Sequence, residues 1–138
     1  MDEGSAGTIL YRQCWTQMSL DEKDIIREPF VVKGFDGHES TPYGLITLPV
    51  TLAGKTVQQE LILMNCDSAY NALLGRDWTT AMEATVSCLY QCLKFPYSER
   101  TIKVRSNQWE AHKCNLRAFT LASAVSASAS EPPPPGSA

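Results

Sequence analysis

The sequence contains no long apolar run: no stretch approaches the roughly 20 consecutive apolar residues that a membrane-spanning helix requires. Its N-terminus also lacks the basic region followed by a hydrophobic stretch that marks a secretory signal. These two absences predict a cytoplasmic protein that has no membrane partner.

Neither sign of charge is in large excess, because 12 basic and 15 acidic residues give a net charge of −3. Strong attraction to nucleic acid or to an anionic membrane surface is therefore not expected. The 138 residues are 43% hydrophobic, which suits one domain with an ordinary core. No internal repeat is visible.

Metal-ligand residues are few and scattered, with only two histidines and five cysteines. The odd number of cysteines argues against a disulfide framework and predicts reduced thiols. Cys88 and Cys92, taken with His112 and Cys114, have C-x3-C and H-x-C spacings that match no common zinc pattern. We therefore expect no metal site and no cofactor.

The composition changes after Leu116, where Ala and Ser dominate before a run of four prolines at positions 132–135. Such a segment buries too little apolar surface to order itself. This predicts a domain over residues 1–116 and a disordered tail over residues 117–138. The alternative for the tail is a ligand for a proline-binding module.

The first part of the chain shows helical spacing. Apolar residues recur at three- to five-residue steps between Ile9 and Met18, which predicts a helix with Trp15 on its core face. The capping-box pattern from Ser19 to Glu22 predicts a second helical turn that ends before Pro29.

Strand patterns follow. Residues rich in β-branched and apolar types predict strands at Phe30–Val32, Tyr43–Leu52 and Thr56–Met64. Turns are expected at the polar, glycine-flanked residues 33–39 and at Ala53–Lys55, and Pro49 predicts an edge strand or a bulge.

The next segments alternate between strand and helix. Leu73–Gly75 predicts a short buried strand ending in a glycine turn, and Asp77–Ala84 predicts a helix. That helix would turn three side chains inward: Trp78, Ala81 and Met82. Val86–Phe95 predicts one more strand closed by Pro96, and Ser106–Asn115 predicts a helical turn capped by Asn107. The order predicts a mainly β fold with one or two short helices.

Several short motifs occur in an ordered series, and together they cover residues 1 to about 116. They include Asp2–Ser5, Ile9–Tyr11, Met18–Asp24, Val32–Phe35, Gly44–Thr51, Ser68–Arg76 and Gln91–Pro96. This series resembles the protease region of plant gypsy-type retrotransposon polyproteins. The resemblance implies a retropepsin-like aspartic protease domain, a single-lobe closed β-barrel in which two identical chains build one active site.

The resemblance also implies roles for particular residues. Asp2 would be the catalytic acid that each chain supplies. The substrate-binding residues would be Gly4 in the catalytic loop and the tip of a covering flap hairpin, Gly34, Phe35, Asp36 and Gly37. Leu73–Gly75 would pack beneath the catalytic loop, and Arg76 would tie that turn to a neighbouring acid.

The chemistry explains why two chains are needed. Two adjacent carboxylates share one proton, so the charged one activates water while the neutral one donates to the substrate carbonyl. One chain supplies a single such Asp, so the expected partners are a second copy of the chain and an extended polypeptide substrate.

Two departures from the family pattern weaken the expected catalysis. Glu3 stands where relatives carry Thr or Ser, whose hydroxyl locks the two loops together, and ionised Glu has no proton to donate. Only Met1 precedes Asp2, whereas relatives carry an apolar strand there. The alternative function is therefore a non-catalytic retroelement-derived domain that binds peptides or proteins at its flap or at an uncovered sheet edge.

Overall fold

The computed structural model describes residues 1–34, 37–114 and 116. By its internal contacts the chain divides into two compact units, residues 1–106 and 107–138, and each is described by itself. The predicted disordered tail, residues 117–138, lies outside the described residues.

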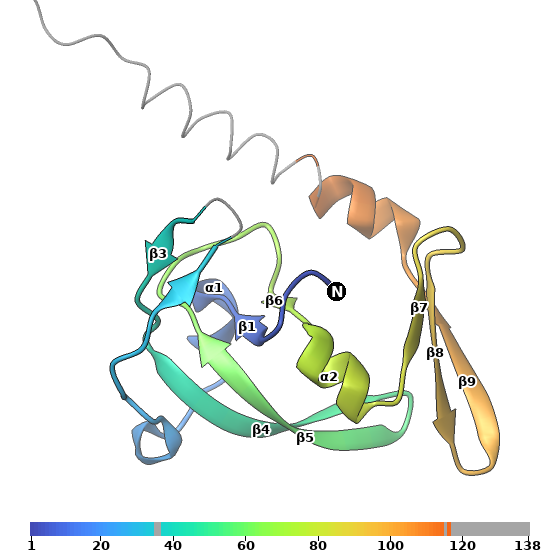
Figure 1. Cartoon of the computed structure of the whole chain (residues 1–138), viewed down its shortest axis with the longest axis horizontal. Coiled ribbons are helices and arrows are strands. Elements are labelled where there is room, and N and C mark those ends of the chain that lie inside the picture. Colours follow the sequence, from blue (N-terminus) through green and yellow to red (C-terminus); the bar gives the residue numbers. More distant parts are fainter. Residues whose placement is uncertain (35–36, 115, 117–138) are drawn as a thin grey trace, which may run out of the picture. The chain divides into compact units, whose positions relative to one another are not determined.

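The first unit is strand-rich with short helices (Figure 1). Its strands are β1 (Thr8–Leu10), β2 (Val32–Lys33), β3 (Glu39–Ser40), β4 (Gly44–Leu52), β5 (Lys55–Leu63), β6 (Ala72–Leu73), β7 (Thr85–Ser87), β8 (Cys92–Tyr97) and β9 (Arg100–Arg105). Its helices are α1 (Arg12–Trp15), the 3₁₀ turn η1 (Glu22–Asp24) and α2 (Arg76–Ala81).

The strands form three separate sheets. The largest has the order β4-β5-β1-β6, with β1 parallel to β5 and antiparallel to β6. β2 and β3 form a two-stranded hairpin, and β7, β8 and β9 form an antiparallel sheet. Figure 1 shows the long β4–β5 hairpin curving past α2.

The described residues do not form the closed barrel that the sequence predicted. Closure requires the two edge strands of a sheet to pair with each other. The largest sheet instead ends at β4 on one side and at the two-residue β6 on the other, and the other sheets stay separate. At the β4 edge, only an isolated bridge between Ile26 and Leu45 adds backbone pairing.

Two apolar clusters hold the first unit together. One lies around the large sheet and contains the fully buried Leu63. The half-buried Trp15 packs on this cluster, as predicted, and its indole N–H donates to the Met64 carbonyl over 2.9 Å. The other cluster joins α2 to β8 through Trp78 and Phe95, each 1% exposed.

The hairpin prediction for residues 43–64 is confirmed by β4 and β5, which pair over nine residues from Gly44↔Leu63 to Leu52↔Lys55. The turn between them places Ala53 and Gly54 at positive φ. Pro49 lies on an edge strand, as predicted, because β4 is the outer strand of its sheet.

The predicted helix from Ile9 to Met18 is wrong in its first part. Residues 8–10 form β1, and helix begins only at Arg12. The apolar spacing could not reveal that β1 pairs with strands about 50 to 60 residues further along the chain, and this pairing outweighs local helical preference. The second helical turn is η1, capped by Asp21 and not by Ser19.

The predicted strand Val86–Phe95 is two strands, β7 and β8, joined by a turn in which Gln91 has a φ of 48°. Pro96 does not end β8. β7 pairs only with residues 92–94, so Pro96 lies where β8 has a partner on one side only. β9 was not predicted, although Ile102 and Val104 show the two-residue alternation of a strand.

Helix α2 confirms the helix predicted after Gly75. Trp78 and Met82 are buried as predicted, with 1% and 0% of their surface exposed. Ala81 is exposed, so its predicted inward position is wrong. Among the described residues no helix combines the length and the apolar character needed to cross a membrane.

The second unit is described only over residues 107–114 and 116, which include helical turns. The Asn107 side chain accepts a hydrogen bond from the Glu110 backbone N–H over 3.2 Å, which confirms the predicted cap. Lys113 forms an ion pair with Glu110 and lies over the Trp109 ring.

Candidate functional site

The loop before β1 holds the Asp2 carboxylate in a fixed direction. Asp2 Oδ1 accepts a hydrogen bond of 2.8 Å from the Gly4 N–H, which makes a compact Asx-type turn. The Ser5 N–H donates to the Asp2 carbonyl, and the Ser5 hydroxyl donates to the Gly7 carbonyl. A Cβ at position 4 would lie only 3.1 Å from Asp2 Oδ1, so glycine suits this turn.

This loop is fastened to the segment that connects β6 to α2. The Asp2 N–H donates to the Leu74 carbonyl over 2.9 Å, and the Arg76 N–H donates to the Ser5 carbonyl over 2.8 Å. A Cβ on Gly75 would collide with the backbone of Gly7 and would lie 2.8 Å from the Ser5 carbonyl oxygen. The apolar turn therefore packs against the Asp2 loop, as the resemblance implied, and only glycine fits the contact.

A partly buried polar cluster stabilises the same junction. Thr8, which has no exposed surface, donates to Asp77 Oδ1 over 2.7 Å and accepts from the Gly75 N–H over 3.1 Å. The Gln59 amide, 4% exposed, donates to Asp77 Oδ2 over 2.7 Å. Within the described residues Arg76 forms no ion pair, so the prediction that Arg76 ties the turn to an acid is wrong. Asp77 provides the tie.

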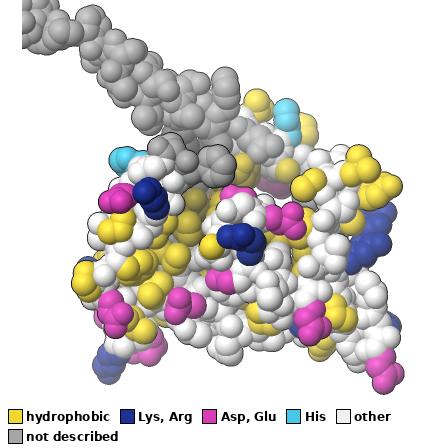
Figure 2. All heavy atoms as spheres, in the orientation of Figure 1, with side chains coloured by type: hydrophobic (Ala, Val, Ile, Leu, Met, Phe, Trp, Pro, Cys, Tyr) yellow, Lys and Arg dark blue, Asp and Glu magenta, His cyan; other side chains and the backbone are white. Residues whose placement is uncertain are grey.

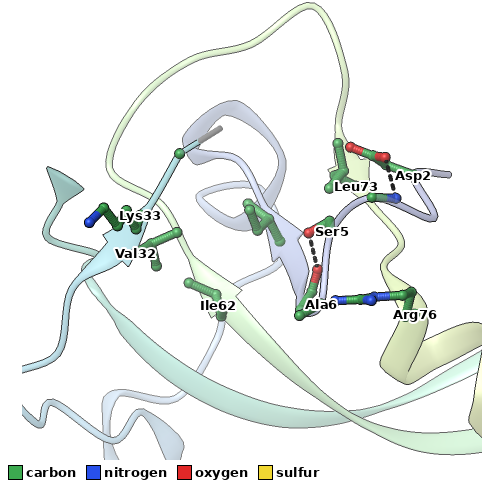
Figure 3. A pocket seen from close by; sticks show the side chains of 12 residues that line it. Asp2, Ser5, Ala6, Val32, Lys33, Ile62, Leu73 and Arg76 are labelled. Carbon is green, nitrogen blue, oxygen red and sulfur yellow. Dashed lines mark hydrogen bonds between the residues drawn. The ribbon is translucent and has the colours of Figure 1, made fainter. Parts of the chain in front are cut away.

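A pocket of about 750 Å³ opens beside Asp2 (Figure 3). The Asp2 loop forms one wall, and residues 32–34 of the β2–β3 hairpin form another. Its apolar lining comes from Ile9, Val32, Ile62 and Leu73, and its charged lining comes from Asp2, Lys33 and Arg76. Figure 2 shows hydrophobic side chains gathered over the β1–β5 part of this face, beside acidic and basic side chains near the chain start.

The pocket brings together three of the predicted site residues: Asp2, Gly4 and Gly34. Gly37 belongs to the same hairpin turn, with a φ of +82° and an N–H that donates to the Gly34 carbonyl, but it does not line the pocket. Phe35 and Asp36 lie outside the described residues.

The apolar floor of the pocket was not predicted. Ile9 and Ile62 lie side by side because β1 and β5 pair in parallel register at these two positions. No local signal joins residues this far apart in the sequence. Their half-buried state reflects a sheet face that the pocket leaves open.

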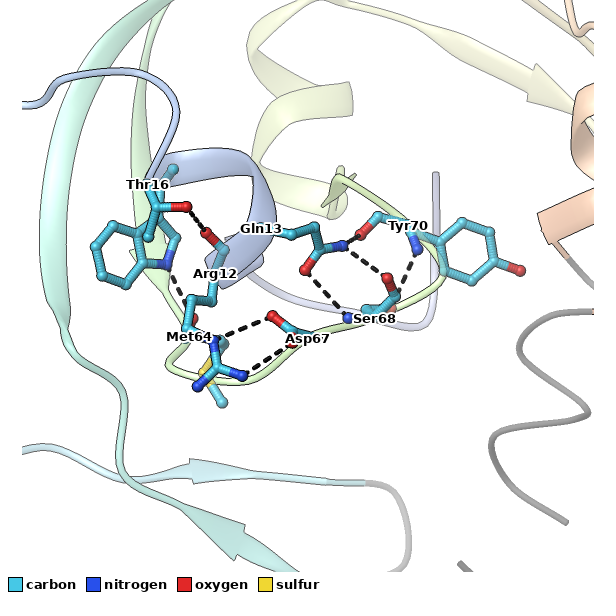
Figure 4. A network of polar contacts seen from close by, with 8 residues as sticks. Arg12, Gln13, Thr16, Met64, Asp67, Ser68 and Tyr70 are labelled. Carbon is cyan, nitrogen blue, oxygen red and sulfur yellow. Dashed lines mark hydrogen bonds and ion pairs between the residues drawn. The ribbon is translucent and has the colours of Figure 1, made fainter. Parts of the chain in front are cut away.

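A second polar network fixes the loop before β6, residues 65–71, to α1 (Figure 4). Arg12 forms a two-pronged ion pair with Asp67, with N–O distances of 3.1 and 2.9 Å. The Gln13 amide donates to the carbonyls of Ser68 and Tyr70, and its oxygen accepts from the Ser68 N–H. The loop that this network fixes continues into β6 and then into the Leu74–Gly75 turn that contacts the Asp2 loop.

Tyr11 immediately precedes α1, and its backbone N–H donates to the Asn71 carbonyl over 3.1 Å. Burial raises the pKa of the Tyr11 phenol, and the nearby charges of Cys66 and Asp2 raise it further, while a hydrogen bond with Ser68 acts in the opposite direction. The neutral phenol is therefore the form that this environment favours.

Among the described residues no group of three or more His, Cys, Asp or Glu side chains is arranged to hold a metal ion. All five cysteines are free thiols. Comparison with protein-family models and with curated proteins finds no match for this chain.

Proposed function

We propose that this chain is a retropepsin-like aspartic endopeptidase domain that works as a homodimer. The observation that carries the proposal is the placement of Asp2. Its carboxylate is oriented by the Gly4 N–H at the edge of a pocket of about 750 Å³, on a loop fastened to the Leu74–Gly75 turn.

The hydrolysis would follow from two such carboxylates facing each other across a twofold axis. The charged Asp2 takes a proton from water, which attacks the peptide carbonyl carbon. The protonated Asp2 donates to the carbonyl oxygen and stabilises the charge that develops there. The proton then passes to the leaving amine as the C–N bond breaks, and the pair again shares one proton.

The pocket suits an extended polypeptide. Apolar side chains from β1, β5 and β6 line it, and residues of the β2–β3 hairpin lie on its opposite wall. An extended peptide presents alternate side chains to such a floor, while its backbone forms hydrogen bonds with neighbouring segments. In this proposal the β2–β3 hairpin would cover the bound peptide.

A second function follows from the same pocket: capture of a peptide without cleavage. The apolar lining exists within a single chain, so peptide binding would not require the Asp2 pair. This domain would bind as a monomer.

The test compares the chain with its Asp2→Asn variant on a denatured, fluorescently labelled polypeptide at about pH 5. The expected result is a cleavage rate that rises with the square of protein concentration at low concentration. Asp2→Asn should reduce it at least about a hundredfold, because the general acid–base pair is lost.

Asp24→Asn, at an exposed position in η1, is the matched control and should leave cleavage unchanged. Equal cleavage by the chain and by Asp2→Asn would remove the endopeptidase proposal. Binding of the labelled polypeptide without cleavage, by a monomer, would establish the second function instead.

A further inference from the structure

The proposed homodimer gathers four carboxylates around its symmetry axis. Asp2 and Glu3 are consecutive, and successive Cα atoms lie about 3.8 Å apart. If the two Asp2 carboxylates face each other, both Glu3 residues also lie close to the axis. The Asp2 pair reduces its own repulsion by sharing a proton. The Glu3 charges need a cation.

The Glu3 carboxylate is unpaired within the part of the chain that the structure describes. Glu3 is exposed, and no hydrogen bond or ion pair of its carboxylate occurs in the described part of the chain. The residues on either side of Glu3 are hydrogen-bonded elsewhere: the Asp2 N–H donates to the Leu74 carbonyl, and the Gly4 N–H donates to Asp2 Oδ1. The Glu3 carboxylate is thus free to meet another molecule.

Arg76 is the matching cation. Its backbone N–H is fixed to the Ser5 carbonyl, so the residue belongs to the same junction as Asp2. Its exposed guanidinium also has no ion pair among residues 1–34, 37–114 and 116. Figure 3 shows the side chain reaching from the start of α2 toward Ala6, beside the pocket.

The other cation at the pocket is less suited to this role. Lys33 lies on β2, on the wall formed by the hairpin, and its ladder partner in β3 is Glu39. An acid directly across the ladder already offers this lysine a counter-charge. Arg76 forms no ion pair among the described residues, and its planar guanidinium can bind a carboxylate through two parallel hydrogen bonds.

We infer that Arg76 of each protomer binds the carboxylate of Glu3 of the partner subunit. In a twofold-symmetric interface every contact from residue i to residue j is repeated from j to i, so each dimer contains two such pairs. The inference rests on the proposed homodimer. It gives Glu3 a bonding role at the position where hydroxyl-bearing residues would otherwise join the two loops.

The direction in which Glu3→Gln changes the dimer affinity distinguishes this inference from simple repulsion between the two Glu3 carboxylates. If the two Glu3 carboxylates only repel each other, Glu3→Gln will tighten the dimer. If they bind Arg76, Glu3→Gln and Arg76→Gln will each weaken it. The dimer dissociation constant, measured by analytical ultracentrifugation at about pH 7, should rise at least about tenfold for each variant. Circular dichroism checks that each variant is folded.

Mixing two charge-reversed variants tests whether the pair lies between protomers. Glu3→Arg places two cations, and Arg76→Glu two anions, at each contact, so each variant alone should dimerise poorly. In the mixture every contact again joins a cation to an anion. Heterodimers should therefore form with an affinity close to that of the unaltered chain. The control mixture combines Glu99→Arg with Arg100→Glu, in the turn and strand that follow β8 and away from the pocket.

The outcomes are distinct. A tighter or unchanged Glu3→Gln dimer, or reversed variants that gain nothing from mixing, overturns the Glu3–Arg76 pair and leaves the homodimeric endopeptidase intact. A chain that stays monomeric at every concentration overturns both the pair and the homodimer. Weakening by each single variant with recovery in the mixture supports the pair.

Discussion

Thr8 illustrates how much one hydroxyl can fix at the residue scale. It is fully buried between the Asp2 loop and α2, and its oxygen both donates to Asp77 and accepts from the Gly75 N–H. A buried donor or acceptor that loses its partner costs more than a hydrogen bond contributes on average. The geometry of the Asp2 loop therefore depends on a residue with no direct contact to solvent.

The substitution Thr8→Val keeps the side-chain shape and removes both hydrogen bonds. It should lower the free energy of unfolding by about 1–3 kcal/mol, because the Gly75 N–H is left unpaired and Asp77 loses a donor. Urea unfolding measures this change. The control is Thr47→Val, at an exposed position of β4 that suits β-branched residues. Equal stability of the two variants would show that the buried hydroxyl does not matter.

At the scale of elements, the short helix α1 positions the loop of residues 65–71 through two contacts of different kinds. The Arg12–Asp67 pair is solvent-exposed, with side chains 45% and 60% accessible. Water screens such a pair, and ordering two long side chains opposes it. Gln13 lies half-buried and makes three hydrogen bonds with the backbone of Ser68 and Tyr70.

Gln13 should therefore contribute more than Arg12, although Arg12 forms the ion pair. Gln13→Ala should lower the free energy of unfolding by about 1–2 kcal/mol, because it removes three hydrogen bonds to the loop backbone. Arg12→Gln should leave that free energy within measurement error. Amide hydrogen exchange of residues 66–71 should also quicken in Gln13→Ala alone. A larger loss in Arg12→Gln would contradict this ranking.

For the molecule as a whole, the raised pKa of Tyr11 predicts how stability depends on alkaline pH. The unfolded chain releases the phenolic proton near the ordinary value of 10.0, while the folded chain holds it to higher pH. The folded state then binds more protons than the unfolded state, so stability falls as pH rises through this range. The stabilisation is complete below the unfolded pKa and is lost on approaching the folded one.

Tyr11→Phe removes this titration. Its free energy of unfolding should fall less steeply than that of the unaltered chain between about pH 9 and about pH 11. A slope will remain, because a hydrogen bond to Glu22 raises the pKa of Tyr43 in the same direction. Urea unfolding at several pH values gives both slopes. Equal slopes would show that Tyr11 titrates alike in the folded and unfolded chains.

The sequence by itself determined the elements whose causes are local. The β4–β5 hairpin follows from β-branched residues on both sides of a glycine turn, and α2 follows from the apolar spacing of Trp78 and Met82. The contact of Gly75 with the Asp2 loop was also predicted, because the motif resemblance names the two segments that meet. These features depend on near neighbours or on a recognisable pair of motifs.

Only the tertiary structure decided the features that depend on distant pairing. Residues 8–10 became a strand because β5 and β6 offer backbone partners on both sides. The pocket floor depends on the register that joins Ile9 to Ile62, and the open sheets depend on edge strands that do not pair with each other in the described part of the chain. The residue that ties the turn after β6 to its surroundings is Asp77 and not Arg76, because the Thr8 and Gln59 side chains both donate hydrogen bonds to the Asp77 carboxylate. These features depend on contacts between residues that are far apart in the sequence, and the local spacing of residues does not reveal such contacts.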